Sequence, residues 1–161
     1  MSEATMTLGS QNGAAAQRPV IVVGVDGSAS SEAAVRWAAE EARRRNARLV
    51  LVHVRQPVLG SVMTVDSRRY RALAVNDTVG LLWQQVTALQ AGEIDAVGRV
   101  GDGCPDEILI ETSQTADLLV LGAEGNGRHR GLLLGDVAQR CARNAACPVV
   151  LIPPPGGRAA A

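Results

Sequence analysis

Residues 117–135 read DLLVLGAEGNGRHRGLLLG, and this stretch decides the fold that the sequence predicts. Its first part, Asp117–Leu121, has the length and the apolar character of a strand buried inside a sheet. Glycines at positions 122, 125 and 127 follow, and they predict a loop because glycine tolerates any backbone angle. A second turn at Gly135–Asp136 begins a helical pattern, so the predicted order is strand, glycine loop, helix.

A junction of this kind is a natural binding site for an anion. Backbone N–H groups without acceptors converge at the start of a helix, and the helix dipole favours negative charge there. The glycine spacing is Gly, two residues, Gly, nine residues, Gly. It is not the closely spaced dinucleotide fingerprint, and it lacks the Gly-Lys-Ser/Thr end of a P-loop. The sequence therefore predicts a phosphate-binding loop of another type.

Strand-like and helix-like segments alternate along the rest of the chain. The predicted strands are Val20–Val25, Leu49–Val54, Ile94–Val100, Asp117–Leu121 and Pro148–Ile152; the predicted helices are Ser30–Arg45, Ser67–Gln90, 105–114 and one that starts at Gly135–Asp136. Ser30 or Ser31 can cap the first of these helices, and Asn46 can end it in the left-handed conformation. This alternation predicts an α/β fold, an open five-stranded parallel sheet with helices on both faces. In such sheets ligands bind beyond the carboxyl ends of the strands, where the strand order reverses.

The domain organisation that we expect is one domain between two short tails. Residues 1–18 are mostly small and polar, which predicts a disordered leader; residues 19–153 form the domain, and residues 154–161 form a flexible tail. The leader lacks the apolar core of a signal peptide, and no window has the composition of a membrane span. We therefore expect a soluble, cytoplasmic protein without a membrane partner.

Composition argues against several classes of function. The formal charge is zero, aromatic residues make up 2% of the chain and Phe is absent, so the stacking platform of a nucleic-acid binder is missing. Cys104, Cys141 and Cys147 form no Cys-x-x-Cys pair, and we interpret them as small buried apolar residues. The two histidines are far apart, which supports neither a metal cluster nor a catalytic triad. His53, at the end of an apolar strand, is interpreted as a core or rim histidine.

The motif Gly122-x2-Gly125-x9-Gly135 resembles the ATP-binding loop of the universal stress protein family, in which Ser or Thr follows the last glycine. This chain has Asp136 there. The segments Val20–Ser28 and Cys147–Ile152 are similar to the opening and closing strands of the family, so the resemblance covers about residues 19–153. It implies a Rossmann-like fold of the adenine nucleotide alpha hydrolase type, with strand order 3-2-1-4-5. That order places the reversal between the first and fourth strands.

The resemblance also implies an adenine nucleotide site, with ATP as the ligand. The matching positions are Asp26, Val54, Leu121, Gly122, Gly125, Gly135, Asp136 and Val137. Asp26 can accept hydrogen bonds from an adenine amino group or a ribose hydroxyl, or it can be a turn residue that binds its own backbone. Val54 would contribute its main chain to the adenine contact. Gly122 and Gly125 either let the backbone approach the phosphates or simply serve a turn.

Two acidic residues depart from the family pattern. Asp136 replaces a hydroxyl residue, and Glu124 stands where the family usually has a basic or polar side chain. A carboxylate a few ångströms from a phosphate costs on the order of 1–4 kcal/mol at effective dielectric constants of about 80 to 20. Asp is also a favoured N-cap, so our hypothesis is that Asp136 partly fills the phosphate site. Arg128, His129 and Arg130, or a bridging Mg²⁺ ion, are the alternatives that would compensate the negative charge.

Three functions follow from these observations. The first is a regulatory protein of the stress response that binds ATP. The second is a dimeric interaction protein of the same fold that has lost or weakened ATP binding. The third, a slow ATPase, has the least support, because no residue is evidently positioned as a base for water.

We also expect a homodimer. The last strand, Pro148–Ile152, is continuously apolar and is followed by further prolines. As the outermost strand it would invite pairing with a second copy, and the prolines would stop the pairing from running on. The family commonly forms a two-fold dimer through this strand.

Overall fold

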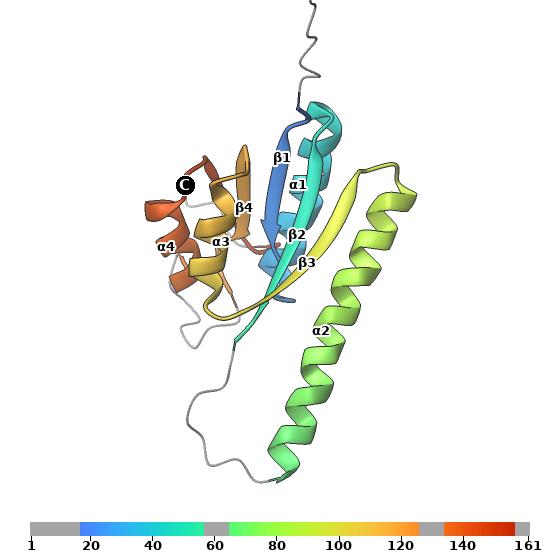
Figure 1. The fold of residues 1–161 in the computed structure, drawn as a ribbon, viewed down its shortest axis with the longest axis vertical. Coiled ribbons are helices and arrows are strands. Elements are labelled where there is room, and N and C mark those ends of the chain that lie inside the picture. Colours follow the sequence, from blue (N-terminus) through green and yellow to red (C-terminus); the bar gives the residue numbers. More distant parts are fainter. Residues whose placement is uncertain (1–16, 57–64, 126–133, 157–161) are drawn as a thin grey trace, which may run out of the picture.

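The computed structural model describes residues 17–56, 65–125 and 134–156, and for residues 65–76 it describes the backbone alone. Strands and helices alternate along the chain (Figure 1). The elements are β1 (Val20–Gly24), α1 (Ala29–Arg45), β2 (Arg48–Arg55), α2 (Val65–Ala91), β3 (Ala96–Asp102), α3 (Pro105–Ser113), β4 (Leu118–Gly122), α4 (Asp136–Asn144) and β5 (Val149–Ile152). The predicted alternation is confirmed, with element bounds within two residues of the predicted ones.

The five strands form one parallel sheet in the order β3-β2-β1-β4-β5, as predicted. Along the chain β1 and β4 are far apart, yet they pair directly, with Ile21 opposite Leu118 and Val23 opposite Val120. Because the strands are parallel, the turns that follow β1 and β4 open at the same edge of the sheet.

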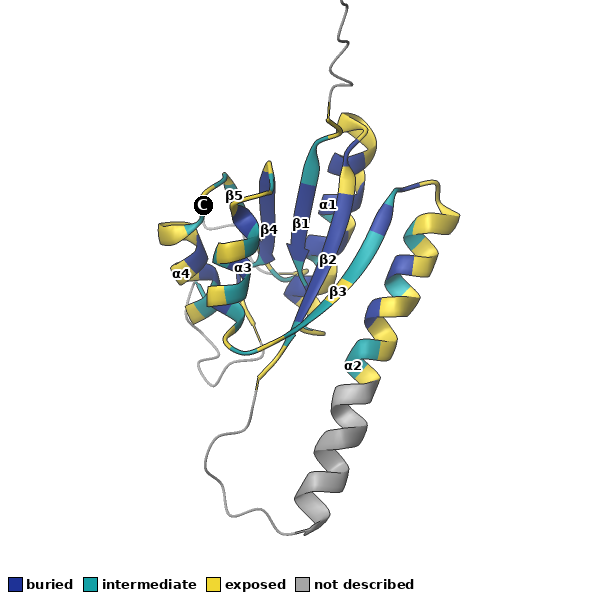
Figure 2. Ribbon diagram, viewed as in Figure 1, coloured by how far each residue is buried: buried dark blue, intermediate teal, exposed yellow. Residues whose placement is uncertain are grey.

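Apolar side chains of the strands cover both faces of the sheet. In β1, Ile21 and Val23 belong to the cluster that packs with α1 and α2, whereas Val22 belongs to the cluster that packs with α3 and α4. Figure 2 shows these buried strands between helices whose outer faces are exposed. Burial of each such side chain contributes about 1.5–3 kcal/mol, which explains why continuous β-branched runs form the central strands.

Helix α1 begins and ends at residues with defined capping roles. The Ser28 side chain accepts a hydrogen bond from the Ser31 N–H at 3.1 Å, so Ser28 is the N-cap. The prediction that Ser30 or Ser31 caps the helix is wrong, because both already lie in its first turn. Asn46 ends the helix in the left-handed conformation, as expected, and its N–H donates to the Ala42 and Arg43 carbonyls.

The cysteines differ in exposure. Cys141 is fully buried on α4, as interpreted from the sequence, and Cys147 is half-buried. Cys104 is exposed, so the interpretation is wrong for this residue. It precedes α3 at the N-cap position, where its side chain lies outside the core. Burial, with a smaller effect of the Asp106 carboxylate, raises the pKa of the Cys141 thiol to about 11.

We expect a thiol reagent to modify Cys104 in the native protein at pH 8 and to leave Cys141 unmodified. Only the thiolate reacts, and a pKa near 11 leaves about one Cys141 thiol in a thousand ionised at that pH. Mass spectrometry of peptides after brief alkylation measures this, with Cys104→Ser as the control and denatured protein as the reference for full labelling. Equal modification rates at Cys104 and Cys141 would contradict the assigned burial.

Candidate functional site

The ends of β1 and β4 meet at the carboxyl edge of the sheet. A Cβ atom placed on Gly125 would lie 3.2 Å from Asp26 Oδ2, so the turn after β1 contacts the loop after β4. Asp26 is exposed to solvent. The structure therefore brings together the two turns that the sequence placed in one crevice.

Asp26 also organises its own turn. Its Oδ1 accepts a hydrogen bond from the Ser28 N–H at 2.9 Å, and its own N–H donates to Ser31 Oγ at 3.2 Å. The sequence allowed two roles for Asp26, a contact with the ligand or a turn residue that binds its own backbone. The structure shows the second role. Because Oδ2 lies beside Gly125, the same carboxylate also borders the glycine loop, and its contact with a ligand stays a prediction.

Gly122 is required by packing inside the protein. A Cβ atom there would lie 2.7 Å from Ser30 Oγ and 2.8 Å from the Ser31 nitrogen, which is closer than a side chain can come. This glycine therefore lets β4 end against the first turn of α1. Leu121, just before it, is 4% exposed and packs in the core, so only its main chain can reach a ligand.

Gly135 closes the glycine loop at its far end. Its N–H donates to the Ala123 carbonyl at 2.7 Å, and a Cβ atom there would lie 3.3 Å from the Gly125 nitrogen. Both ends of the loop therefore touch at the start of α4. The basic residues that we considered as compensating charges, 128–130, lie outside the described residues.

The start of α4 corrects one prediction. Gly135, not Asp136, is the N-cap, with φ −70° and ψ 159°, and no side chain of the described residues caps the helix. Asp136 is the first helical residue and is exposed, so it does not occupy the first-turn amides as an N-cap would. Those amides keep the direction and the dipole that favour an anion. Val137 is half-buried in the core cluster of α3 and α4, so its main chain is the part that borders the loop.

The end of β2 lies beside the end of β1 at the same edge of the sheet. Val54 is half-buried against the α3 and α4 cluster. His53 is buried, as predicted, and its Nδ1 lies 2.8 Å from the Val25 carbonyl oxygen. A carbonyl only accepts, so Nδ1 carries the proton and donates. His53 thereby fixes the residue that immediately precedes Asp26.

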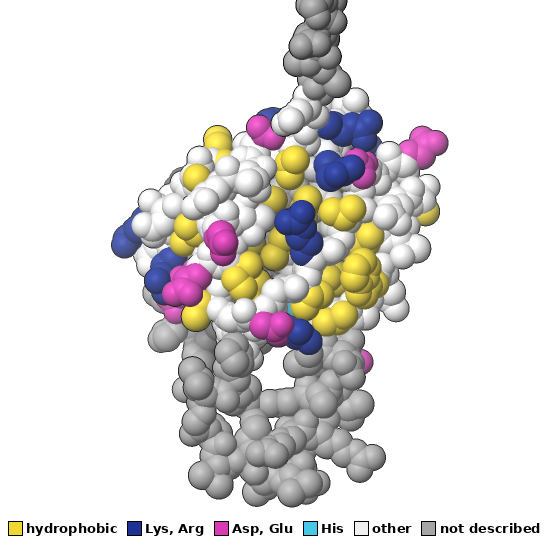
Figure 3. Space-filling view, in the orientation of Figure 1, with side chains coloured by type: hydrophobic (Ala, Val, Ile, Leu, Met, Phe, Trp, Pro, Cys, Tyr) yellow, Lys and Arg dark blue, Asp and Glu magenta, His cyan; other side chains and the backbone are white. Residues whose placement is uncertain are grey.

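The described part of the loop is acidic. Glu124 and Asp136 are exposed at its two ends, and Asp26 is exposed in the neighbouring turn after β1. Arg55, at the end of β2, pairs with Asp102, with 2.7 Å between Arg55 Nε and Asp102 Oδ1, and this contact raises the pKa of the guanidinium. Among the described residues, no group of three or more His, Cys, Asp or Glu side chains is placed to hold a metal ion. On the face in Figure 3, acidic and basic side chains are interspersed.

Three serines at the start of α1 contribute to the site: Ser28, Ser30 and Ser31. The sequence predicts Ser30 and Ser31 only as possible helix caps. Ser30 Oγ donates to the Ile152 carbonyl at 2.7 Å and accepts from the Glu124 N–H at 3.4 Å. Ser28 Oγ donates to the Glu124 carbonyl at 3.5 Å. The only signal in the sequence was the density of hydroxyl residues directly after Asp26-Gly27.

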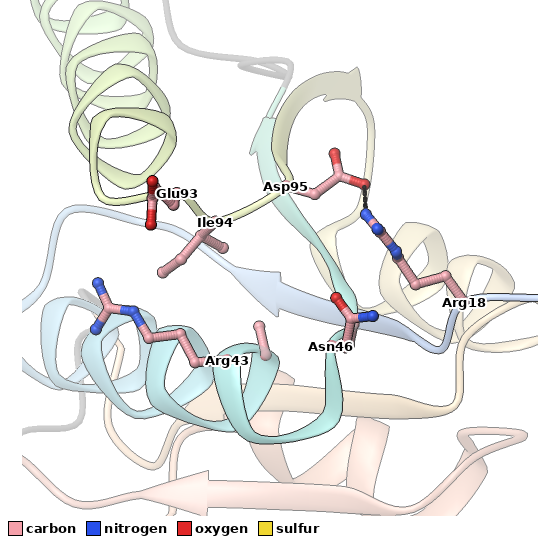
Figure 4. A pocket seen from close by; sticks show the side chains of 8 residues that line it. Arg18, Arg43, Asn46, Glu93, Ile94 and Asp95 are labelled. Atoms are coloured by element: carbon pink, nitrogen blue, oxygen red, sulfur yellow. Dashed lines mark hydrogen bonds and ion pairs between the residues drawn. The ribbon is translucent and has the colours of Figure 1, made fainter.

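A polar hollow of about 220 Å³ lies at the opposite edge of the sheet, between the end of α1 and the turn before β3 (Figure 4). Arg18 pairs with Asp95 at 3.1 Å, and Arg43 pairs with Glu40 at 2.9 Å, so both cations that line the hollow already have partners. The Arg48 guanidinium, followed by that of Arg18, lowers the pKa of Asp95. This hollow shares no residue with the glycine loop.

Comparison with known proteins identifies one family that this chain resembles. The model of the Universal stress protein family matches residues 18–153. Universal stress protein Rv2623 of Mycobacterium tuberculosis is 32% identical over an alignment of 140 residues that covers 82% of this chain and 46% of that protein. The chain thus spans about half the length of this curated relative.

Solved structures of similar fold include nucleotide complexes. A universal stress protein in complex with cAMP is 28% identical, with a TM-score of 0.62 over 83% of this chain and 96% of that one. A universal stress protein family protein from Arabidopsis thaliana with AMP bound is 22% identical, with a TM-score of 0.64 over 86% of this chain and 93% of that one. At 22% identity, the likeness to the Arabidopsis protein shows a shared fold and nothing more.

In the part of the chain that the structure describes, no helix is both long enough and apolar enough to cross a bilayer.

We expect Gly122→Ala to lower the free energy of unfolding by about 1–3 kcal/mol, because the added methyl group overlaps Ser30 and the backbone of Ser31. Gly80→Ala is the matched control. No described atom lies within 4 Å of a Cβ there, and alanine favours the helix by about 0.5–1 kcal/mol. Urea unfolding followed by circular dichroism measures both. Equal stability of Gly122→Ala and wild type would contradict the packing role of Gly122.

Proposed function

The chain belongs to the universal stress protein family, and we propose that it is a regulatory protein of the stress response that binds an adenine nucleotide, ATP, at the carboxyl edge of its sheet. The observation that carries the proposal is the closeness of the Asp26 carboxylate to Gly125, on which a Cβ atom would lie 3.2 Å from Asp26 Oδ2. It joins a carboxylate at the end of β1 to a glycine loop that leads into the start of α4. Relatives whose structures hold cAMP or AMP support the ligand class.

In this proposal the adenosine lies on the β1 and β2 side of the crevice. The Asp26 carboxylate accepts hydrogen bonds from the adenosine, and the main chain of Val54 borders the base. The phosphates lie against Gly125 and the start of α4, where the first-turn amides of α4 donate to them. The main chains of Leu121 and Gly122 form the floor of the crevice.

We propose binding without hydrolysis. The groups assigned to the nucleotide are one carboxylate at the adenosine and backbone amides at the phosphates. None of them has the role of a base that activates water. The slow ATPase therefore remains the least supported function.

A second function, in which the protein acts as a dimeric interaction module with weak or no ATP binding, is favoured by the acidic loop. Glu124 and Asp136 are both exposed beside the glycines. A carboxylate near a phosphate weakens binding, and each 1.4 kcal/mol corresponds to about tenfold in affinity. A magnesium ion held between Asp136 and the phosphates would remove this cost.

In both functions we propose a two-fold dimer through β5. This strand is at the edge of the sheet, and in the described structure it pairs with β4 alone. The Leu119 N–H donates to the Pro148 carbonyl, and the Ala123 N–H donates to that of Ile152. Since successive residues of a strand face opposite sides, the N–H and C=O groups of Val149 and Leu151 are directed outward.

Calorimetric titration with ATP and magnesium tests the nucleotide site. We expect wild type to bind, Asp26→Ala to bind about tenfold more weakly because it loses a charged acceptor, and Asp136→Ser to bind about tenfold more tightly. Asp77→Ser, at an exposed position of α2, is the matched control and should equal wild type. Absence of binding by wild type and by Asp136→Ser would refute the proposed ligand. Equal affinities of wild type and Asp136→Ser would remove the electrostatic effect of Asp136.

Size-exclusion chromatography with light scattering tests the dimer. We expect wild type at micromolar concentration to have twice the chain mass of 16.8 kDa, and Val149→Lys to have the monomer mass, because a lysine on an edge strand blocks pairing. Circular dichroism confirms that the variant is folded. A monomeric wild type would exclude this dimer.

A further inference from the structure

A chain of hydrogen bonds connects the glycine loop to the end of β5. The Ile152 carbonyl accepts from the Ala123 N–H at 2.7 Å and from Ser30 Oγ at 2.7 Å. The Ser30 hydroxyl in turn accepts from the Glu124 N–H at 3.4 Å. The last residue of β5 is therefore held by the same segment, 123–125, that borders Asp26.

Ser30 is the centre of this chain. It is 2% exposed, and its hydroxyl donates to one partner and accepts from another. The side chain lies over Gly122, where a Cβ atom would be 2.7 Å from its Oγ. Because a buried hydroxyl that loses a partner is costly, the loop and the end of β5 cannot move independently of each other.

The edge of β5 is the surface that a second copy would use. All four of its residues, Val149–Ile152, are apolar and partly exposed. The backbone N–H and C=O groups of Val149 and Leu151 point away from β4, and Ile152 is the next residue of the strand. The geometry at Ile152 thus sets how far the edge stays extended and available for pairing.

We propose that Ser30 is a positioning residue that couples nucleotide binding in the loop to the pairing of a second copy of this chain along β5. This inference rests on the proposed nucleotide site and on the proposed dimer. Phosphates bound by the loop fix segment 123–125. The Ala123 N–H and the Ser30 hydroxyl then fix Ile152, so that β5 loses less freedom when it pairs. Nucleotide therefore strengthens the dimer.

Such coupling is reciprocal. Each dimer has two nucleotide sites, so if dimerisation lowers the nucleotide dissociation constant of each site by a given factor, saturating nucleotide lowers the dimer dissociation constant by the square of that factor. Couplings of this kind are typically about 5- to 150-fold. We expect saturating nucleotide to lower the dimer dissociation constant of wild type at least about fivefold. In a variant that lacks the Ser30 hydroxyl, we expect this factor to be near one.

Analytical ultracentrifugation with and without ATP and magnesium measures the dimer constant, and absorbance of the sedimenting protein at 260 nm shows in the same cell whether nucleotide is bound. The variant is Ser30→Ala. The matched control is Ser113→Ala, which removes a hydroxyl that is 1% exposed, donates to the Ile110 carbonyl at 2.6 Å and accepts from the Ala146 N–H at 2.8 Å. Both variants lose a buried serine near β5, but only Ser30 touches the glycine loop.

The expected result is an effect of nucleotide on the dimer constant in wild type and in Ser113→Ala, and none in Ser30→Ala. Wild type that carries no nucleotide would refute the proposed function itself, and the coupling with it. Wild type that binds nucleotide with an unchanged dimer constant would overturn the coupling alone. Wild type that stays monomeric would refute the proposed dimer, and the coupling with it. If Ser30→Ala keeps the full effect, Ser30 has no part in it.

A second comparison does not depend on the stability of Ser30→Ala. Monomeric Val149→Lys should bind nucleotide more weakly than the wild-type dimer, by the square root of the factor by which saturating nucleotide lowers the dimer dissociation constant. Equal affinities of this monomer and of the dimer would overturn the proposal.

Discussion

The carboxyl edge of this sheet depends on the contact between Gly122 and the first turn of α1. At this point β4 passes so close to Ser30 and Ser31 that no side chain fits between them. The contact brings Ser30 Oγ within reach of Glu124 and of Ile152, and it brings Gly125 beside Asp26. One steric constraint thus aligns the turns after β1 and β4 with the end of β5.

The site that results is largely a backbone surface. The glycine loop closes on itself through the Ala123 carbonyl and the Gly135 N–H, and it leads into a helix that no described side chain caps. Backbone amides and a helix dipole suit a phosphate, whereas the exposed carboxylates of Glu124 and Asp136 oppose one. The balance between these opposing effects would decide which of the two proposed functions applies.

Much of this arrangement could be predicted from local sequence. The β-branched runs fixed the central strands, and the resemblance of the glycine motif supplied the strand order. The choice of N-cap could not be predicted, because Ser28, Ser30 and Ser31 are equally good caps by residue type. Contacts outside the helix distinguish them: the Ser30 hydroxyl donates to the distant Ile152 carbonyl and the Ser31 hydroxyl accepts from the Asp26 N–H, whereas Ser28 accepts from the first turn. Asp136 misled for a similar reason, since Gly135 takes the extended cap conformation that Asp usually prefers. Long-range packing decides such positions.

The most direct test of the nucleotide site is an amide chemical-shift titration of the labelled protein with ATP and magnesium. Binding at the carboxyl edge shifts the amides of Asp26, Gly125 and Val137 and leaves those of Asn46 and Glu93, which line the hollow at the opposite edge, in place. Shifts confined to Asn46, Glu93 and their neighbours, with Gly125 unchanged, would contradict the assignment of the site.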